Sequence, residues 1–413
     1  ADVNIKNDEG CSPLHLACSE GFFTVVAQLI QLGADIDLKN YEQSTALHLA
    51  SSKGHNDIVS ELLTAKADAN IRDRTKSTPL HLATSGGHFS IVSQLVSDGV
   101  DMDVNAQDAS RNTASHIAAK NGLKSIVSEL ITSSPDLSLK NDQDYTALHF
   151  ASANGHHEVL KLLLDALVAN GAGGGTAAIV NSKNKSGDTA LHMAIVNGHK
   201  DAVSLLVAAG GDVNAANANK MSVLHLAVTY KHDFIVKALL ASPGIDVNSR
   251  NSEKATPLHI AAQSHLGEIV TAFLNANADI LATDSKGLSA LDYAADAQKG
   301  TSSFSKSLKQ SNWVTSLVDA SFAARFGTGQ KSPECKSFGD SNINMLIYEA
   351  STSGDDVSLK CLLARGGNPD GHRHEKLKSS SLQMASRNGH ASAVKMLLSA
   401  RADVDLANNE NQT

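Results

Sequence analysis

Apolar residues along this chain recur with the spacing of short helices. In residues 78–96, Leu80 and Ala83 fall on one stripe of a helix about two turns long, and Ile91 and Leu95 fall on the stripe of a second helix. Two glycines separate the stripes, at a point where glycine tolerates the left-handed backbone that ends a helix. A polar stretch follows the second stripe. The pattern therefore predicts a pair of short antiparallel helices followed by a polar loop.

The same pattern recurs along nearly the whole chain with a base period of 33 residues. Each copy opens with a Ser or Thr, whose hydroxyl can cap the first helix, and some copies continue with Pro, which suits the first helical position. Two helices this short cannot bury their own apolar face, so we expect neighbouring copies to stack into one continuous core. The copies begin at residues 12, 45, 78, 113, 146, 189, 222, 256 and 289, weaker copies begin at Met345 and Ser380, and a last origin lies at Thr413.

A histidine stands at the fourth place of each of the first eight copies. One turn into its helix, such an imidazole can bond back to the loop and to the Ser or Thr that opens the copy. A metal site would need three or four ligands at one point, whereas the period spaces these histidines one per layer. We therefore interpret them as structural. They are His15, His48, His81, His116, His149, His192, His225 and His259.

The period and its recurring words resemble the ankyrin repeat. The words are SPLHLA from Ser12, TALHLA from Thr45, TPLHLA from Thr78 and TPLHIA from Thr256. The resemblance implies an all-α ankyrin-repeat solenoid of helix pairs joined by projecting β-hairpin loops. It also implies that the repeated histidine ties one hairpin to the next repeat. In this family, partners bind in a concave groove formed by hairpin tips and the exposed ends of the first helices.

The repeats divide the chain into three parts. Residues 1–298 hold a partial repeat (1–9) and about nine repeats with a loop extension at 165–180, and residues 343–413 hold about two repeats and the start of another. Between them, residues 299–342 form an insertion with a predicted extra helix at 305–326. This insertion is either a lengthened second helix packed on its own repeat or an element that binds a partner or bends the stack, and a boundary between two stacks near 330–342 stays open. Both chain ends match the middle of a repeat, so we expect a piece of a longer protein.

Composition and charge narrow the function. Apolar residues make up 42% of the chain and aromatic residues only 4%, which suits closely packed short helices. The net charge of −8 has no basic excess, which argues against nucleic acid as a partner. No run of apolar residues is long enough to insert into a membrane. The four cysteines show no disulfide or metal spacing, so we expect reduced thiols and an intracellular protein, cytoplasmic or nuclear.

Two local features resemble known kinds of site in part. The glycines of residues 162–187 lack the GK[ST] ending of a phosphate-binding loop and follow no strand. His372 and His374 could share a metal ion, but two ligands on a loop are weak evidence. With no unexplained nucleophile–base pair either, we expect no enzyme, no catalytic residue, no cofactor and no metal site.

The surface of the first helices is the best candidate for function. Most residues at the seventh to ninth places of each copy are small and neutral, which favours an extended segment or a helix of another protein. Val196, Thr229 and Tyr230 stand out there, and Lys220 and Lys254 lie on nearby hairpin tips; Trp313 in the insertion is a further candidate. The neighbouring Ile195 and Val228 could instead be buried. We expect a non-enzymatic interaction scaffold; the alternative is a tether or regulatory arm of a larger protein such as an ion channel, kinase or multi-subunit assembly.

Overall fold

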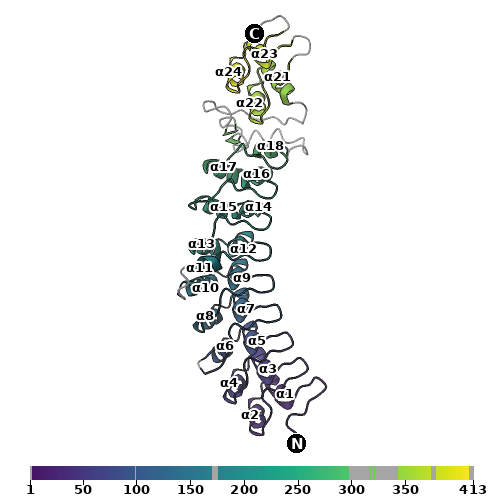
Figure 1. Cartoon of the computed structure of the whole chain (residues 1–413), viewed down its shortest axis with the longest axis vertical. Helices are drawn as coiled ribbons and strands as arrows, with labels where there is room; N and C mark the ends of the chain where they lie inside the picture. Colours follow the sequence, from purple (N-terminus) through teal and green to yellow (C-terminus); the bar gives the residue numbers. More distant parts are fainter. Residues whose placement is uncertain are drawn as a thin grey trace. The chain divides into compact units, whose positions relative to one another are not determined.

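The structure is a computed structural model that describes residues 2–97, 99–169, 175–296, 316–317, 320–321, 343–373 and 378–408. Within these residues it is helical, with 22 helices and no strand (Figure 1). The predicted all-α class is confirmed. Helices alternate between the first and second member of each predicted pair.

The first helices of the repeats share a length of two to three turns and begin just after the Ser or Thr of each copy where one is present. They are α1 (Pro13–Glu20), α3 (Ala46–Lys53), α5 (Pro79–Ser85), α7 (Ala114–Asn121), α9 (Ala147–Ala153), α12 (Ala190–Val196), α14 (Val223–Thr229), α16 (Pro257–Gln263), α18 (Ala290–Asp296), α21 (Ile343–Ser353) and α23 (Ser381–Arg387).

The second helices follow after a short turn. They are α2 (Phe23–Gln31), α4 (Asn56–Thr64), α6 (Phe89–Leu95), α8 (Lys124–Thr132), α10 (His157–Ala169), α13 (Lys200–Ala208), α15 (Asp233–Leu240), α17 (Gly267–Asn275), α22 (Asp356–Ala364) and α24 (Ala391–Ser399). One further short helix, α11 (Gly175–Val180), follows α10.

Small and aliphatic side chains form the core between neighbouring repeats. The alanine at the sixth place is almost fully buried, as at Ala50, Ala83 and Ala118, and lets adjacent first helices approach closely. The second helices bury their apolar stripes, for example Ile91 and Leu95 of α6. Because each stripe packs against the next repeat as well as its own, the core is continuous along a stack.

By its internal packing the chain divides into two compact units, residues 1–218 and residues 219–413. In the first unit, α1, α3, α5, α7, α9 and α12 pack in succession, as do α2, α4, α6, α8, α10 and α13. In the second unit, α14, α16 and α18 pack in succession, and α21–α24 pack on one another. In both units the loops between repeats project on the side of the first helices (Figure 1).

The loops between repeats are closed by turns, where we expected β-hairpins. In a representative loop, the N–H of Asn40 donates to the carbonyl of Ser44 at 3.0 Å. Each loop also bonds its neighbour, as where the N–H of Arg74 donates to the carbonyl of Glu42 at 2.8 Å. Among the described residues these bonds do not extend into strands and form only isolated bridges, such as the one between Thr283 and Ser289.

The longer repeat step holds the added turn of helix that we expected at residues 162–168, and a further short helix where the sequence predicted the rest of a loop extension at 165–180. Helix α10 continues to Ala169, and α11 begins at Gly175. The cause is burial: Leu163, Leu164 and Leu167 extend the apolar stripe of α10 with helical spacing and are buried. The predicted helix at 305–326 and Trp313 lie outside the described residues, apart from residues 316–317 and 320–321, which are helical. None of the described helices is long and apolar enough to cross a membrane.

Glycine and histidine are matched across the repeat boundary. Gly54 ends α3 with φ +84°, and a Cβ at this position would lie 2.7 Å from Cε1 of His88 in the next repeat. The same close approach pairs Gly21 with His55 and Gly122 with His156. The ring therefore fits only because the preceding turn has no side chain.

We expect Gly54→Ala to destabilise the protein more than Gly33→Ala. Gly33 has nearly the same φ, +83°, with nothing within 4 Å of the added Cβ. Both changes incur the left-handed backbone strain of about 1 kcal/mol, and only Gly54→Ala adds a clash with His88, for a total of roughly 2–4 kcal/mol. Urea unfolding followed by circular dichroism measures both. Equal losses in the two variants would show that the turn yields and that the close approach carries no energy.

Candidate functional site

The repeated histidine joins the start of its own helix to the loop of the next repeat. At His81, the backbone N–H of Thr78 donates to Nδ1 at 3.1 Å, and Oγ1 of Thr78 lies 2.8 Å from the same atom. Because Nδ1 accepts, the ring proton is on Nε2, which donates to the carbonyl of Asn112 at 3.0 Å. One neutral imidazole therefore caps α5 and closes the following loop.

These bonds recur along both compact units. At His192, the N–H of Thr189 likewise donates to Nδ1 at 3.1 Å. The forward bonds from Nε2 are 2.9–3.1 Å long and bind His15, His48, His81, His116, His149, His225 and His259 to the carbonyls of Ser44, Ser77, Asn112, Tyr145, Asp188, Ala255 and Leu288, respectively.

A second row of histidines binds in the opposite direction. These residues stand at the start of the second helices, and their Nε2 atoms lie 3.1–3.2 Å from carbonyls of the preceding repeat's first helix. The repeats that open at Thr45, Thr78 and Thr146 are thus tied to both of their neighbours. The pairs are His55 with Ser19, His88 with Ser52, His156 with Lys120, His199 with Ala153 and His390 with Thr352.

Burial keeps the first row of histidines neutral. Desolvation lowers the pKa of His149 from 6.5 to about 4, and the bond to the carbonyl of Asp188 offsets this only in part. Burial is also the largest cause of the lowered pKa of His15, His48, His81, His116, His225 and His259. A protonated ring would also lose its acceptor at Nδ1. Among the described residues, no three His, Cys, Asp or Glu side chains are arranged to hold a metal ion.

The comparison with protein families agrees with this arrangement. A model of three ankyrin repeats matches residues 1–73, 32–108, 58–141, 80–172, 166–251 and 224–309, and a model of one ankyrin repeat matches residues 379–409. The chain belongs to the ankyrin-repeat family. No curated protein matches it. Ankyrin repeats generally mediate protein–protein interactions, and proteins built from them are typically non-catalytic interaction modules.

Tyr348, Gln383 and Asp292 stand in the histidine place of three copies, and the last two show chemically different replacements. In the repeat that opens at Ser380, Oε1 of Gln383 accepts the N–H of Ser380 at 2.9 Å and Nε2 donates to the carbonyl of Leu406 at 2.8 Å. Glutamine therefore reproduces both bonds of the imidazole. It does so without a titratable group.

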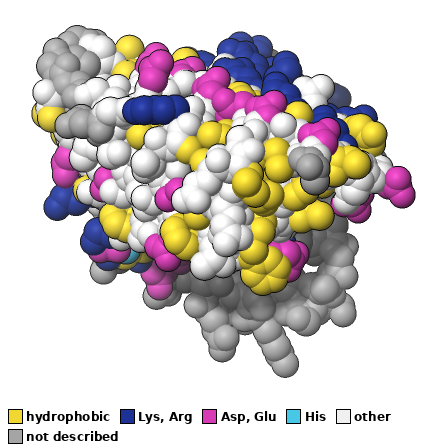
Figure 2. Space-filling model, turned by 90° about the horizontal axis from the view of Figure 1, so that it is seen from below, with side chains coloured by type: hydrophobic (Ala, Val, Ile, Leu, Met, Phe, Trp, Pro, Cys, Tyr) yellow, Lys and Arg dark blue, Asp and Glu magenta, His cyan; other side chains and the backbone are white. Residues whose placement is uncertain are grey.

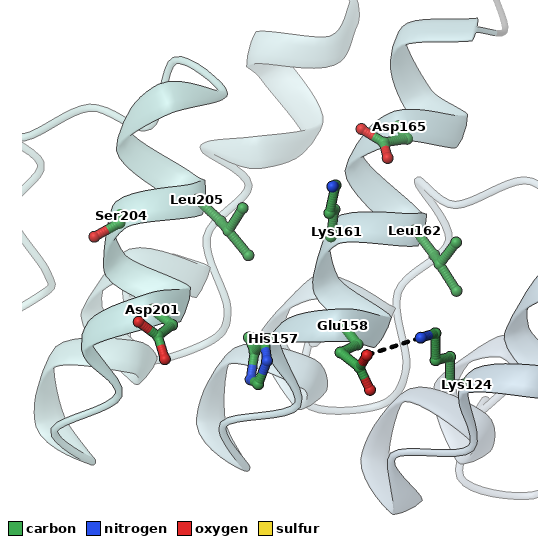
Figure 3. A pocket seen from close by; sticks show the side chains of 9 residues that line it. All are labelled: Lys124, His157, Glu158, Lys161, Leu162, Asp165, Asp201, Ser204 and Leu205. Atoms are coloured by element: carbon green, nitrogen blue, oxygen red, sulfur yellow. Dashed lines mark hydrogen bonds and ion pairs between the residues drawn. The ribbon is translucent and has the colours of Figure 1, made fainter.

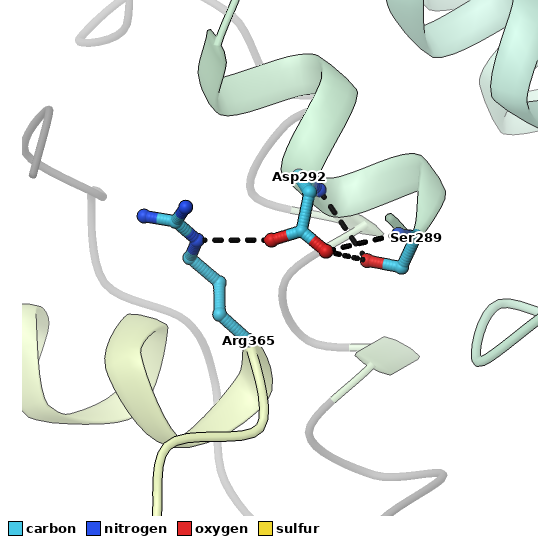
Figure 4. A network of polar contacts seen from close by, with 3 residues as sticks. All are labelled: Ser289, Asp292 and Arg365. Atoms are coloured by element: carbon cyan, nitrogen blue, oxygen red, sulfur yellow. Dashed lines mark hydrogen bonds and ion pairs between the residues drawn. The ribbon is translucent and has the colours of Figure 1, made fainter. Parts of the chain in front are cut away.

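Asp292 replaces the histidine in the repeat that opens at Ser289 (Figure 4). Its Oδ2 accepts from the N–H and the hydroxyl of Ser289 at 2.9 and 2.7 Å. A carboxylate cannot donate onward to a carbonyl, so its other oxygen needs a donor, and Nε of Arg365 lies 3.2 Å away. The two side chains are 17% and 16% exposed, so this ion pair is largely shielded from water. It joins α18 to the end of α22, on the two sides of the predicted insertion.

The residues predicted for partner binding fall into both compact units. Val196 is half-buried at the end of α12 in the first unit. Thr229, Tyr230, Lys220 and Lys254 are exposed in the second unit. Trp313 lies outside the described residues. Ile195 and Val228, their neighbours in sequence, are fully buried and belong to the core.

The turn that carries Tyr230 differs from the others. Lys231, in the next position, has φ +59°, where most repeats have glycine. In the next repeat Leu266 stands where others carry the backward-binding histidine. At the equivalent pair, a Cβ added to Gly87 would meet only Leu123, at 3.9 Å. Leaving out the histidine thus permits two long exposed side chains, Tyr230 and Lys231, on one turn.

A hollow of about 570 Å³, which the sequence did not predict, lies on the second helices (Figure 3). Leu162 and Leu205 line it together with charged residues of α8, α10 and α13, and Nζ of Lys124 pairs with Glu158 at 2.7 Å. The feature of the sequence that could have indicated this hollow is the unusual length of the segment that forms α10. Its charges are mixed in sign, and it holds none of the predicted site residues.

The cysteines depart in part from expectation. Cys11 and Cys18 are free and buried, and burial raises the pKa of the Cys18 thiol to about 12. Cys361 is disulfide-bonded, so the expectation of four reduced thiols is wrong for this residue. His372 lies against the ring of Tyr348, with centroids 5.3 Å apart, and His374 lies outside the described residues.

We expect His149→Gln to make folding less sensitive to acid. The folded pKa of His149 is below its unfolded value, so its contribution is fully present above pH 6.5 and is lost as the pH falls toward 4. Between pH 8 and pH 5 this loss is about 2 kcal/mol in the wild type and should be absent in the variant, which can bond as Gln383 does. Urea unfolding at both pH values measures the difference.

His149→Ala is the matched control for that experiment. It also removes the titration, but it loses both hydrogen bonds and should therefore be less stable than His149→Gln at every pH. If the glutamine variant and the wild type lose the same free energy between pH 8 and pH 5, the ring does not resist protonation in the folded chain.

We expect Asp292→His to destabilise the protein, although histidine occupies this place in eight other repeats. The ring can keep the cap on Ser289, but its Nε2–H would face the Nε–H of Arg365. The loss should be about 1–2 kcal/mol, and Arg365→Gln should restore much of it by offering an acceptor. Chemical unfolding of both single variants and the double variant measures this coupling. Additive effects in the cycle would contradict a direct interaction.

Proposed function

We propose that the chain is a non-enzymatic scaffold that binds an extended acidic segment or a helix of another protein. Recognition uses the first helices and loops of the second compact unit. The observation that carries this proposal is Tyr230, which is 49% exposed at the end of α14. In the other described repeats the same place holds Glu, Lys, Gly, Asn or Ser, so no structural need of the repeat demands a tyrosine there.

The position of Tyr230 suits the centre of an interface. Its ring stacks on that of His232, with centroids 6.4 Å apart and planes inclined by 10°, which restrains the side chain before a partner arrives. Thr229 beside it donates its hydroxyl to the carbonyl of His225 and presents its methyl group. A pre-ordered aromatic ring loses little conformational entropy on binding and offers both apolar area and a hydroxyl.

Lysines on the same side of the helix pairs favour an acidic partner. Lys220, Lys231 and Lys254 are exposed, and each has a left-handed backbone with φ between +55° and +60°. That backbone costs about 1 kcal/mol for a residue other than glycine. Glu253 is the acidic neighbour on the loop of Lys254. The surplus of positive charge would accelerate association with an acidic segment and would weaken with added salt.

The compartment belongs to this proposal as well. The buried free thiols of Cys11 and Cys18 support an intracellular location, cytoplasmic or nuclear, while the disulfide at Cys361 is the observation against it.

We expect Tyr230→Ala to weaken binding of selected peptide ligands by roughly 30-fold, the loss typical of a tyrosine at an interface centre. The ligands come from a random-peptide display library selected on the whole chain. Dissociation constants by fluorescence anisotropy, at low and high salt, measure the effect. Selected sequences should be rich in Asp and Glu, and Lys220→Glu with Lys254→Glu should slow association.

Tyr41→Ala is the matched control, since Tyr41 is a similarly exposed tyrosine on a loop of the first compact unit. Circular dichroism verifies that both variants are folded. Peptides that bind Tyr230→Ala as tightly as Tyr41→Ala would remove this surface from the proposal.

A further inference from the structure

Two leucines stand on the second helices at a place where other repeats have polar or small residues. Leu162 in α10 and Leu205 in α13 occupy this place in neighbouring repeats, and both are half-buried in the lining of the hollow (Figure 3). The repeat itself therefore does not require a large apolar side chain there. The four earlier repeats have Gln28, Glu61, Gln94 and Glu129 at this place, and the two later ones have Ala238 and Ala272.

A third apolar side chain continues this surface along α10. Val168 is 68% exposed and lies three residues after Asp165, so the two are on the same side of the helix. An exposed apolar residue by itself is common on protein surfaces. On the end of the molecule where α1 and α2 lie, for example, hydrophobic and charged side chains lie among one another (Figure 2). The hollow differs because its apolar residues border one concave site.

The hollow has a surplus of negative charge. Nζ of Lys124 pairs with Glu158 at 2.7 Å, so these two charges offset each other. Of the other charged residues that line the hollow, Asp165 and Asp201 are acidic and Lys161 is basic. None of these three forms an ion pair or a side-chain hydrogen bond with another described residue. Two carboxylates in this state favour a cationic partner.

The spacing of the two carboxylates suits a helix. Asp201 lies at the start of α13 and Asp165 lies toward the end of α10, at opposite corners of the hollow (Figure 3). Seven places along the helix and one interhelical spacing of about 10 Å put their Cα atoms about 15 Å apart. Three turns of a crossing helix are about 16 Å long. One helix can therefore reach both carboxylates while it covers the leucines between them.

We propose that the hollow between α8, α10 and α13 is a docking site for a basic amphipathic helix of another protein. A large apolar residue of that helix rests on Leu162 and Leu205, and a Lys or Arg on each side of it pairs with Asp165 and Asp201. Lys161, which lies between the two leucines in Figure 3, adds the methylene groups of its stem to the contact.

A second copy of the chain fits this site less well, because two copies docked through the same hollow would bring the same negative surplus together. The proposal also goes beyond the surface around Tyr230. That surface belongs to the first helices and loops of the second compact unit and favours an acidic partner, whereas the hollow belongs to the second helices of the first unit and favours a basic one.

The test selects helices on the whole chain with Tyr230→Ala, so that the surface around Tyr230 does not contribute. The probes are displayed helices of about 20 residues with one face randomised. Selected helices should carry a large apolar residue with Lys or Arg on both sides. By fluorescence anisotropy, the double variant Leu162→Gln, Leu205→Gln should bind the corresponding synthetic peptides roughly tenfold or more weakly.

The double variant should fold, since Gln28 and Gln94 stand at the same place in other repeats, and circular dichroism verifies this. Glu61→Gln is the matched control, because it changes the same place in a repeat outside the hollow, and it should leave binding unchanged.

Variants of opposite charge test the electrostatic part. Asp165→Asn and Asp201→Asn should each weaken binding by roughly threefold to tenfold and make it less sensitive to salt. Lys161→Gln removes a positive charge from the same surface and should not weaken binding by more than twofold or so. The three variants together distinguish recognition of a basic helix from a general loss of surface charge.

Three results would overturn the proposal. One is a set of selected helices that bind the leucine double variant as tightly as its parent. Another is selected helices rich in Asp and Glu, or binding that Lys161→Gln weakens and the two aspartate variants do not. The third is a chain that dimerises in sedimentation and becomes monomeric with Leu162→Gln, which would assign the hollow to a second copy. Each of these results would leave the surface around Tyr230 untouched.

Discussion

The structure depends on an imidazole that bonds in two directions. Alone, a helix of two turns is unstable, and its first N–H groups need partners. The fourth-place histidine accepts from the residue that opens the helix and donates to the following loop, so one side chain sets both the start of a helix and the distance to the next repeat. Each bond is worth only about 1 kcal/mol net, but burial makes every unmade bond costly.

The neutrality of these rings has a cause and a consequence. Burial lowers the pKa of the first-row histidines, of which His149 is the strongest case. Acid therefore acts on the fold at many equivalent places, one per repeat. Gln383 and Asp292 replace the histidine with different chemistry. The amide of Gln383 makes the same two bonds as the imidazole without a titratable group, whereas the carboxylate of Asp292 requires a cationic donor, which Arg365 supplies. The identity of the fourth residue thus decides what kind of neighbour a repeat accepts.

Small departures at repeat boundaries create the candidate surfaces. Where a histidine of one repeat bonds to the first helix of the preceding repeat, the turn that ends that helix must be glycine, as Gly54 and His88 show. Where Leu266 replaces that histidine, the turn carries Tyr230 and Lys231 instead. This arrangement is consistent with a scaffold function, because the histidine bonds hold the repeats together and leave the sequence of the outward turns free to vary.

Much of the fold was determined by the sequence alone, because an ankyrin repeat is local. The helix pairs, the buried alanines and the place of each histidine follow from a spacing that one repeat already contains, and each interface repeats the one before. The direction of the histidine bonds, the second short helix α11, the burial of Ile195 and the pairing of Asp292 with Arg365 required the tertiary structure. These depend on residues 29 or more positions apart and on which apolar side chains find a neighbour, and no local period encodes that. The candidate surface was likewise named in part from the sequence, but only packing showed that Tyr230 is exposed and that Val196 belongs to the other compact unit.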